Sequence, residues 1–361
     1  MRRYRTALIG LGRIASTIDD EVVGNSSVML PYAHMACYRE VPEIEVIAAA
    51  DPYPEQREAF RQRWGVDRLY ADYRELLEKE KPEIVSVATS AKPRPEIVID
   101  CARAGVRAIY AEKPIALSLA EADRMIAACR EHQVKLAIGC TRCWNAYWNR
   151  ARALIDQGEL GRILQVIGSG QAGLSHNGSH LLTLVRYLAG GQVRWVFGEM
   201  ESDEKAAGDE DLPGNGYLAF DNGARAFIRT WPTGGANWEF EVVGETGRIR
   251  SLANGLDFEW WQAPSGPRAE PTRRVFPRPQ RIESPGIRAV RDLIDCLETG
   301  KDPTCSGEDG RAALEVAIAL RESHRRGGVR IDLPLANREL RILSAETLRG
   351  DLPVALRRAR G

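Results

Sequence analysis

The sequence predicts an α/β protein in which a doubly wound parallel sheet is followed by an α+β domain with an open, mainly antiparallel sheet. Up to about residue 140, short β-branched runs alternate with helical stretches, which is typical of a parallel sheet covered by helices. After about residue 150, strand-like runs are joined by tight Asn-Gly and Thr-Gly turns, which favour antiparallel hairpins. We therefore expect one domain over residues 1–140 and a second over 141–361.

The first domain has an ordered series of predicted elements. Strands are expected where short apolar runs end in a glycine or a polar residue, at 6–12, 44–51, 83–89, 107–114 and 135–140. Helical periodicity predicts the intervening helices at 54–65, 94–105 and 118–133. The last of these begins with Ser118, followed three residues later by Glu121, which is the pattern of a capping box.

The second domain mixes hairpins with helices. Its strands are expected in "ILQVIGSG", "GYLAFDNGARAFIRTW" and "EFEVVGETGRIRSL". Helices are expected in "SHLLTLVRYLAGG", "IRAVRDLIDCLETG" and "GEDGRAALEVAIALRESHRRG". The stretch 263–286 is rich in Pro, Arg and Ser and is predicted to be a loop. We expect the final helix, near 307–326, and the tail after it to pack back on the first domain.

The composition excludes several classes of protein. Fifty Lys and Arg residues balance fifty Asp and Glu residues, so no nucleic-acid partner is expected. No apolar run is long enough to span a membrane, and the N-terminus has the pattern of a first strand rather than a signal peptide. The seven cysteines are scattered and odd in number, so we expect no disulfide framework and a cytoplasmic location. No metal site is expected.

A glycine-rich turn follows the first strand. Gly10 and Gly12 of "GLGRIA" can form a tight turn that brings backbone N–H groups close to a pyrophosphate. Asp51 ends the second strand, where an acid hydrogen-bonds the ribose diol of a dinucleotide and disfavours a 2′-phosphate. The pattern predicts NAD as cofactor, with NADP possible if Arg57 compensates. The extra residues 18–34 form an insertion that either contacts the substrate or is a surface loop.

A lysine stands at the carboxyl end of a predicted parallel strand, where such sheets bind ligands. Lys113 in "AEKP" is one of only seven lysines in a chain that otherwise uses arginine. Its ammonium group can hydrogen-bond a substrate hydroxyl and stabilise negative charge. A surface ion pair is the alternative interpretation.

Two histidines lie four residues apart in "SHNGSH". His176 and His180 suggest a metal pair, a catalytic pair or two unrelated side chains. Gly178 and Ser179 indicate that a helix begins here, capped by Ser179 or Asn177, so His176 would precede the helix. The two imidazoles would then not share a helical face, which disfavours a metal pair. His180 is the first candidate for a general base and His176 the second.

Several motifs in order resemble one family. "GLGRIA", "AADPYPE", "YADYRELL", "AEKPIALSLAEADRMIAAC", "GELGRI", "NGSHLLTLVRYLAG" and "SGEDGRAALEVAIALRES" are similar to the Gfo/Idh/MocA oxidoreductases, which include glucose–fructose oxidoreductase and inositol dehydrogenase. The resemblance implies an N-terminal Rossmann domain, NAD(P)-dependent chemistry on a carbinol, and a homodimer or homotetramer formed through the C-terminal sheet. It places the family's EKP lysine at Lys113 and its catalytic histidine at His180, whereas His176 stands where the family often has Asp.

The expected site residues fall into three groups. Catalysis is expected to involve Lys113, His180 and His176. Cofactor contacts are expected from Gly10, Gly12, Arg13, Ile14, Asp51, Thr89, Glu112 and Lys113. Substrate contacts are expected from Arg142, Trp144, Asn145 and Asn177, although a core role competes for the aromatic residues. Trp238 is expected either to stack on a sugar or to cover the sheet.

These observations predict an NAD(P)-dependent dehydrogenase or reductase acting on a CH–OH group of a sugar, polyol or related small molecule. His180 would exchange the hydroxyl proton, and Lys113 would hydrogen-bond the same oxygen. Two alternatives remain open. The protein could cleave glycosides through transient oxidation and elimination, or it could bind the nucleotide without catalysis as a regulatory protein.

Overall fold

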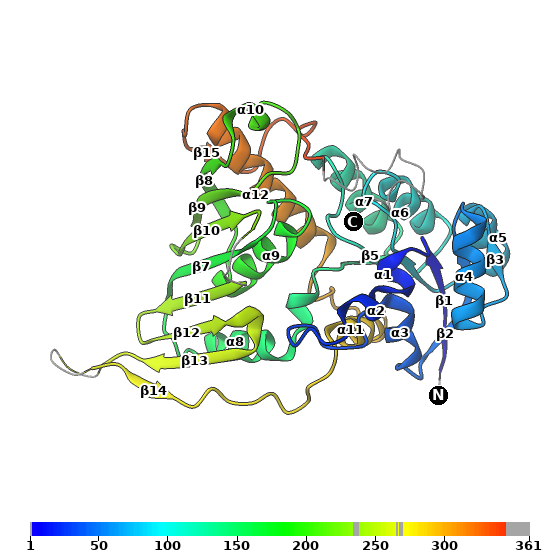
Figure 1. The fold of residues 1–361 in the computed structure, drawn as a ribbon, viewed down its shortest axis with the longest axis horizontal. Coiled ribbons are helices and arrows are strands. Elements are labelled where there is room, and N and C mark those ends of the chain that lie inside the picture. The colour runs from blue at the N-terminus through cyan, green and yellow to red at the C-terminus, as the bar shows by residue number, and fades with distance from the viewer. Residues whose placement is uncertain (1, 234–237, 265, 267–269, 344–361) are drawn as a thin grey trace.

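The computed structural model describes residues 2–343 except 234–237, 265 and 267–269. The end of the predicted second domain, residues 344–361, therefore lies outside the described residues. Two sheets organise the fold, with the first half of the chain on one side of Figure 1 and the second sheet on the other.

The first sheet is parallel and doubly wound, as predicted. Its strand order is β3-β2-β1-β4-β5-β6, so the chain reverses direction across the sheet between β1 and β4. Ligands bind outside the carboxyl ends of the strands at such a reversal. The strands are β1 (Tyr4–Ile9), β2 (Ile44–Ala50), β3 (Leu69–Tyr70), β4 (Ile84–Val87), β5 (Ala108–Ala111) and β6 (Lys135–Ile138).

Helices cover both faces of this sheet. They include α4 (Pro54–Trp64), α5 (Tyr73–Glu80), α6 (Arg94–Arg103) and α7 (Leu119–Glu131). The predicted capping box is confirmed, because the Ser118 hydroxyl accepts from the Glu121 N–H and the Glu121 carboxylate accepts from the Ser118 N–H. Strand β3 and helix α5 are not among the predicted elements. A two-residue strand carries too little periodicity to be recognised in the sequence.

The insertion divides the connection between β1 and β2 into short helices. These are α1 (Arg13–Ser16), α2 (Ile18–Val22) and α3 (His34–Arg39). Asp19 closes the loop between α2 and α3, because its Oδ1 atom accepts from Tyr32 N at 2.9 Å and Ala33 N at 2.6 Å. The Ser284 hydroxyl donates to the carbonyl oxygen of Pro31, which ties the loop to the second half of the chain.

The second sheet is open and mainly antiparallel, as predicted. Its order within the described residues is β14-β13-β12-β11-β7-β10-β9-β8-β15, and only β7 and β10 pair in parallel. The strands are β7 (Ile163–Gln171), β8 (Val193–Met200), β9 (Gly214–Phe220), β10 (Arg225–Trp231), β11 (Glu239–Gly244), β12 (Gly247–Leu252), β13 (Asp257–Gln262), β14 (Thr272–Arg274) and β15 (Ile331–Asp332). Because β14 pairs with β13, the prediction of a loop throughout 263–286 is wrong at residues 272–274.

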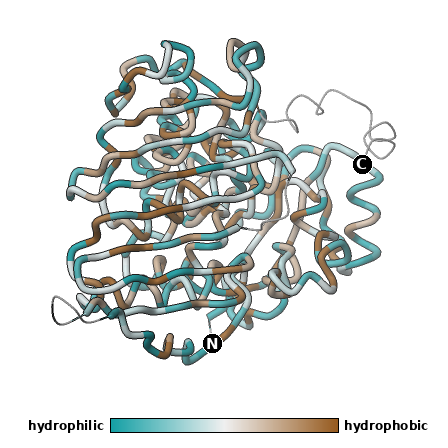
Figure 2. The backbone as a smooth tube through the Cα atoms, turned by 60° about the vertical axis from the view of Figure 1, so that its left-hand side comes forward, coloured by the Kyte–Doolittle hydropathy of each residue, from teal (hydrophilic) through white to brown (hydrophobic). Residues whose placement is uncertain are grey.

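Helices pack on the second sheet, and some aromatic side chains of its strands are exposed. The helices of this half are α8 (Ala146–Asp156), α9 (Gly178–Ala189), α10 (Asp203–Ala206), α11 (Pro285–Thr299) and α12 (Gly307–Arg325), with short 3-10 turns η1 (Thr141–Trp144) and η2 (Ala253–Gly255). Helices α9 and α12 pack on the sheet, at β7 and β8. Figure 2 shows hydrophobic and hydrophilic residues alternating along these strands. Phe197 and Phe227 remain exposed and both contact the Tyr217 ring.

The two halves are joined by more than the connection after β6. Helix α12 packs against β8 and also against α7, and α11 packs against α3. After α12, two backbone hydrogen bonds join the chain to the start of α7. Ala120 N donates to Arg338 O at 2.8 Å, and Ile342 N donates to Leu117 O at 2.9 Å. The division into 1–140 and 141–361 stays a prediction. No helix in the described part of the chain is both long and apolar enough to cross a bilayer.

Candidate active site

The glycine turn lies at the carboxyl end of β1 and is held by Asp51. Gly10 has φ +87°, and an added Cβ atom would lie 2.9 Å from the backbone nitrogen of Thr89. Asp51 follows β2 directly, and its carboxylate accepts from Leu11 N at 2.8 Å and Tyr53 N at 2.9 Å. Burial raises the pKa of Asp51, although these two backbone hydrogen bonds and Arg57 oppose that change. Asp51 therefore stabilises the glycine turn by hydrogen bonding, and it also lies next to the turn where a ribose is expected.

The space around this turn fits a dinucleotide. The Cβ position of Gly12 has no atom within 4 Å, so the backbone is open where a pyrophosphate would lie. Thr89, at the end of β4, has a buried Oγ1 atom without a hydrogen-bond partner in the described residues. Ile14 is half-buried, whereas Arg13 is exposed and ion-paired with Glu21 at 2.6 Å. Six predicted cofactor contacts thus lie just after the ends of β1, β2 and β4: Gly10, Gly12, Arg13, Ile14, Asp51 and Thr89.

Glu112 and Lys113 follow β5, and a histidine from the insertion supports them. His34 is 3% exposed, stacks on Tyr110, and places Nε2 3.1 Å from Glu112 Oε1. Its Nδ1 atom is hydrogen-bonded to the hydroxyl of Ser86. Burial would raise the pKa of Glu112, but the hydrogen bond and charge of His34, with Lys113 and Arg94, outweigh it and lower that pKa. Glu112 is therefore an ionised carboxylate beneath the lysine.

Lys113 reaches from the first half of the chain to the second. Its Nζ atom is 3.4 Å from His176 Nε2 and 3.4 Å from Asn177 Oδ1. Its backbone N–H donates to Glu112 Oε2 at 3.1 Å, which fixes the start of the side chain. The structure thus brings together Lys113, His176 and Asn177, three residues that the sequence predicted for the site.

The loop that carries His176 is held by Asp211, which the sequence analysis missed. The Asp211 carboxylate accepts from Ser175 N at 2.8 Å and His176 N at 2.7 Å. Burial raises the pKa of Asp211, against these backbone hydrogen bonds and the charge of Lys113. An added Cβ atom on Gly173 would lie 2.7 Å from this carboxyl group, so glycine is required there. The sequence signal was weak, since Asp211 is one of several acids in "GDEDLPG".

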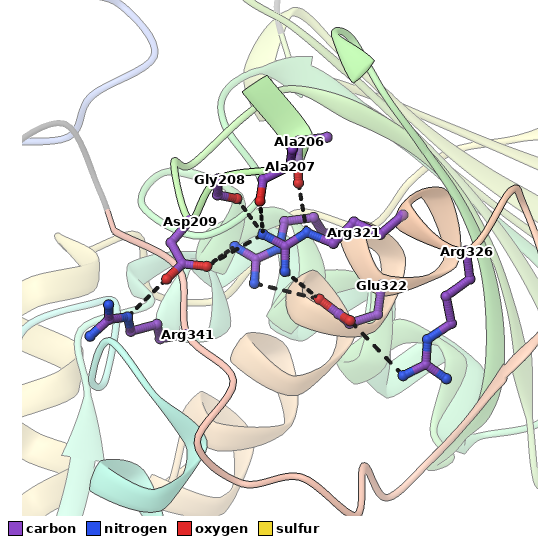
Figure 3. Close-up of polar contacts among 9 residues, drawn as sticks. Ala206, Ala207, Gly208, Asp209, Arg321, Glu322, Arg326 and Arg341 are labelled. Atoms are coloured by element: carbon purple, nitrogen blue, oxygen red, sulfur yellow. Dashed lines mark hydrogen bonds and ion pairs between the residues drawn. The ribbon is translucent and has the colours of Figure 1, made fainter. Parts of the chain in front are cut away.

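A network of arginines fixes the segment that ends in Asp211. Arg325 donates from Nε to the carbonyl oxygen of Ala206 at 2.6 Å and from Nη2 to those of Ala207 and Gly208. Figure 3 shows these carbonyls beside Asp209, which lies between Arg341 and Arg321. The network anchors residues 206–209 to α12. Asp211, which holds the His176 loop, therefore follows directly after an anchored segment.

His180 lies in the first turn of α9, and His176 precedes the helix, as predicted. Asn177, one of the two predicted caps, stands at the N-cap, but its side chain makes no capping hydrogen bond, and the Ser179 hydroxyl donates to Ser175 O. His180 is 6% exposed, and its Nδ1 atom has no hydrogen-bond partner in the described residues. Burial lowers the pKa of His180 well below 6.5, and the charges of Lys113 and Arg142 lower it further. The imidazole is therefore neutral near pH 7.

Arg142 extends the site toward the second sheet. Its Nη2 atom donates to Asn254 Oδ1 at 2.6 Å, and its guanidinium lies 4.1 Å from the centre of the Trp238 ring. Asn254 N donates to Trp238 O at 2.9 Å, so the three residues support one another. Burial lowers the pKa of Arg142 to about 10. Neither Asn254 nor its contact with Arg142 was predicted, because the residues are far apart in the sequence.

The insertion delivers a tyrosine to the same place. The Tyr32 phenol interacts with the side chain of Thr141, and its pKa is raised by burial and Glu112 and lowered by Thr141 and Arg142. The phenol therefore lies between the lysine side of the site and Arg142. Tyr32 thus lies close to Glu112 and Arg142, and a substrate contact by residues 18–34 stays a prediction.

Two of the predicted substrate contacts have other partners. Trp144 is 2% exposed, and its indole N–H donates to Asp292 at 2.9 Å. The Asn145 side chain caps α8 by accepting from Tyr147 N at 2.9 Å. These contacts assign packing to Trp144 and capping to Asn145, so the structure does not bring them together with Lys113.

The cysteines and the remaining acids do not form another site. All seven cysteines are free and buried, including Cys140 and Cys143 of the C-x-x-C pair. Thr183 donates to Cys140 Sγ at 3.4 Å, one helical turn after His180. Within the described residues, no group of three or more His, Cys, Asp or Glu side chains is placed to hold a metal ion.

A dinucleotide turn, a lysine after β5 and a buried neutral histidine on an open-sheet domain define a nicotinamide-dependent oxidoreductase. Residues 4–140 match the oxidoreductase family model with an NAD-binding Rossmann fold, and residues 167–333 match the C-terminal alpha/beta domain of the same family. The chain belongs to the Gfo/Idh/MocA oxidoreductase family. This confirms the predicted family, enzyme class and nicotinamide cofactor.

Curated relatives and solved structures agree with this assignment. The chain is 26% identical to the myo-inositol 2-dehydrogenase of Thermotoga maritima over 88% of this chain and 96% of the relative. It is also 26% identical to the D-apiose dehydrogenase of Paraburkholderia graminis, over 91% of this chain and 89% of the relative. Levoglucosan dehydrogenase in complex with NADH has the same fold, with a TM-score of 0.77 at 20% identity, covering 92% of this chain and 100% of that structure.

Proposed function

We propose that this protein transfers a hydride between a secondary carbinol of a sugar, polyol or related molecule and nicotinamide, with His180 as general acid and base. The observation that carries the proposal is the neutral, buried His180, on which the charge of Lys113 acts. Lys113 itself follows β5 of the first sheet, whose strand β1 is followed by the glycine turn. Lys113 hydrogen-bonds the reacting oxygen, because its Nζ atom extends into the site from the end of β5.

His180 and Lys113 divide the work on one hydroxyl group. A neutral imidazole can take the hydroxyl proton in the oxidative direction and return it in the reductive one. The ammonium of Lys113 stabilises the negative charge that develops on that oxygen. His176 lies 3.4 Å from this ammonium and positions it, in the place where the family often has a carboxylate.

Residues after β1, β2 and β4 would hold the nicotinamide cofactor. Bound NAD accepts or donates the hydride at nicotinamide C4. Gly10, Gly12 and Thr89 line the opening for the dinucleotide, and Asp51 stands at its rim. The Asp51 carboxylate favours NAD over NADP because it repels a 2′-phosphate. The Nη1 atom of Arg57 donates to the backbone carbonyl oxygens of Asp51 and Pro52.

A second candidate function is the cleavage or hydration of a sugar derivative by transient oxidation. It is favoured by 28% identity to the 2,7-anhydro-N-acetylneuraminate hydratase of Mediterraneibacter gnavus, over 48% of this chain. This reaction would leave no net NADH. A regulatory protein without catalysis is disfavoured because Lys113 and His180 are both present.

We also infer a homodimer or homotetramer formed through the second sheet, and a cytoplasmic location. Phe197 and Phe227 are 40% and 44% exposed beside Trp195 and Tyr217, and such a cluster is typical of a protein interface. Seven free, buried thiols suit a reducing compartment. Size-exclusion chromatography with light scattering, on wild type and Phe227→Arg, tests the interface.

The experiment that tests the reaction is a screen of sugars, polyols and sugar acids at 340 nm. Wild type should form NADH, and Lys113→Ala and His180→Ala should each lower kcat/KM by roughly 10²–10⁴-fold while NADH still binds. Product without net absorbance change would favour the second candidate. Activity unaffected by either substitution would overturn the proposed roles.

A further inference from the structure

The guanidinium of Arg142 is a half-buried positive charge without a carboxylate partner in the described residues. Its hydrogen bond goes to the neutral amide of Asn254 at 2.6 Å. The titratable groups that act on it are the Tyr32 phenol and the thiols of Cys140 and Cys143, none of which is a carboxylate. Partial removal of such a charge from water is costly unless an anion compensates it.

Arg142 still has donors to offer. Its Nε and Nη1 atoms make no hydrogen bond within the described residues, and neither is among the fully buried nitrogen atoms that lack a partner. The Nε of Arg94 and that of Arg186, by contrast, are fully buried in this way. At these two atoms the Arg142 guanidinium is therefore not fully buried, which leaves N–H donors for a ligand. Its plane is kept in place by the Trp238 ring at 4.1 Å.

The nearby acids are already engaged on the other side of the site. Glu112 is paired with His34 at 3.1 Å, and Asp211 accepts from the N–H groups of Ser175 and His176. Lys113 and Arg142 both act on His180, so the site has two cations around the proposed base. This arrangement disfavours a purely neutral substrate.

We propose that the substrate is a sugar acid, a polyhydroxylated carboxylate whose carboxyl group pairs with Arg142 while a carbinol lies between Lys113 and His180. A carboxylate can take two parallel N–H donors from Arg142, one from the second hydrogen of Nη2 and one from its neighbour Nε or Nη1, and Trp238 and Asn254 hold the guanidinium in position. The proposal rests on the proposed function, since it assigns the anion to the substrate of the same reaction.

Matched pairs of compounds that differ only in the carboxylate test this substrate class. The pairs are D-gluconate with D-glucitol, D-glucuronate with D-glucose, and D-galacturonate with D-galactose, and D-glucose 6-phosphate serves as the phosphate probe. Wild type should favour the acid in at least one pair by tenfold or more in kcat/KM with NAD. Arg142→Gln should bring that ratio near one, mainly by raising KM, and Arg142→Lys should restore part of it.

Two further variants separate charge from folding. Asn254→Asp keeps the shape of the side chain but supplies an internal carboxylate to Arg142, so the preference for the acid should fall at least threefold. Arg103→Gln, on the exposed end of α6, is the matched control and should leave the ratio unchanged. Acids no better than their neutral partners, an equal loss of both in Arg142→Gln, or a preference for the phosphate would each overturn the proposal.

Failure of the reaction itself can be distinguished from failure of the substrate class. If no compound is oxidised, the proposed function fails, and calorimetric titration of the NADH-bound enzyme decides the substrate class. Each acid should then bind more tightly than its neutral partner in wild type and not in Arg142→Gln. Equal binding of the two compounds would overturn the sugar-acid proposal, whatever the activity.

Discussion

The cofactor side and the substrate side of this site are built in different ways. Gly10, Asp51 and Thr89 lie at the ends of strands in one sheet, and backbone hydrogen bonds tie Gly10 to Ala50 and Asp51 to Tyr70 on the neighbouring strands. Lys113, His176 and Arg142 instead depend on partners that come from distant segments, including Asp211 and Asn254. Substitutions that affect the backbone should therefore change the cofactor side of the site. Substitutions of single polar side chains should change the substrate side.

The largest effect is expected from a change in the glycine turn. Gly10→Ala should lower the free energy of unfolding by roughly 2–4 kcal/mol, because φ is +87° and the new Cβ atom would meet Thr89 at 2.9 Å. Gly12→Ala is the matched control, with φ −74° and no atom within 4 Å of the Cβ position. It should change stability by less than about 0.5 kcal/mol but weaken NADH binding by about tenfold.

Denaturant unfolding and fluorescence titration with NADH measure the two effects. Equal destabilisation by both substitutions would contradict the different environments assigned to the two glycines. Unchanged NADH affinity in Gly12→Ala would contradict the placement of the pyrophosphate.

An intermediate effect is expected when the His176 loop loses its acid. Asp211→Asn keeps one acceptor oxygen but turns an amide N–H toward either the Ser175 or the His176 N–H. The lost hydrogen bond should lower kcat by about tenfold, while the Kd for NADH stays unchanged. Steady-state kinetics and NADH titration provide the check. A parallel loss of NADH affinity would show that the two sides of the site are not separable.

The smallest effect concerns the pH dependence of kcat/KM. His180 must be neutral to accept a proton, and its pKa lies well below 6.5 through burial and the charges of Lys113 and Arg142. Activity should therefore persist as the pH falls through 6.5 and decline only at lower pH. Arg142→Gln removes one positive charge, which makes protonation easier and should raise this acid limb by up to about one pH unit with a neutral substrate. An unchanged or lowered limb would argue against His180 as the base.

The same contrast explains what could be predicted from the sequence. The strand series and the capping box of Ser118 and Glu121 depend on residues close together in the chain, and both are confirmed. Asn177 occupies the N-cap of α9, as one of the two predicted alternatives, but neither predicted side chain caps the helix, because Ser179 donates to Ser175 O and the Asn177 amide oxygen accepts from Lys113. Strand β14 was missed because its three residues have exposed side chains and pair only at the edge of the sheet.

In the candidate site, too, residues within short motifs could be predicted, whereas contacts between residues far apart in the sequence could not. Gly10, Asp51, Lys113 and His180 carry signals in short motifs, so the sequence could single them out. The tie between His34 and Glu112 spans 78 residues, and that between Arg142 and Asn254 spans 112. No local pattern predicts such pairs, because the tertiary fold alone brings them together.

One contact near the end of the described chain has a consequence for protein synthesis. Leu343 O accepts from Asp211 N at 3.0 Å, and Leu343 N donates to Asp209 O at 2.6 Å, while Arg341 bridges to Ser118. A ribosome releases the glycine turn, Lys113 and His180 long before it releases Leu343. The nascent chain can therefore form its nucleotide turn early, but the acid behind His176 gains its support from Leu343 only after that residue has left the ribosome.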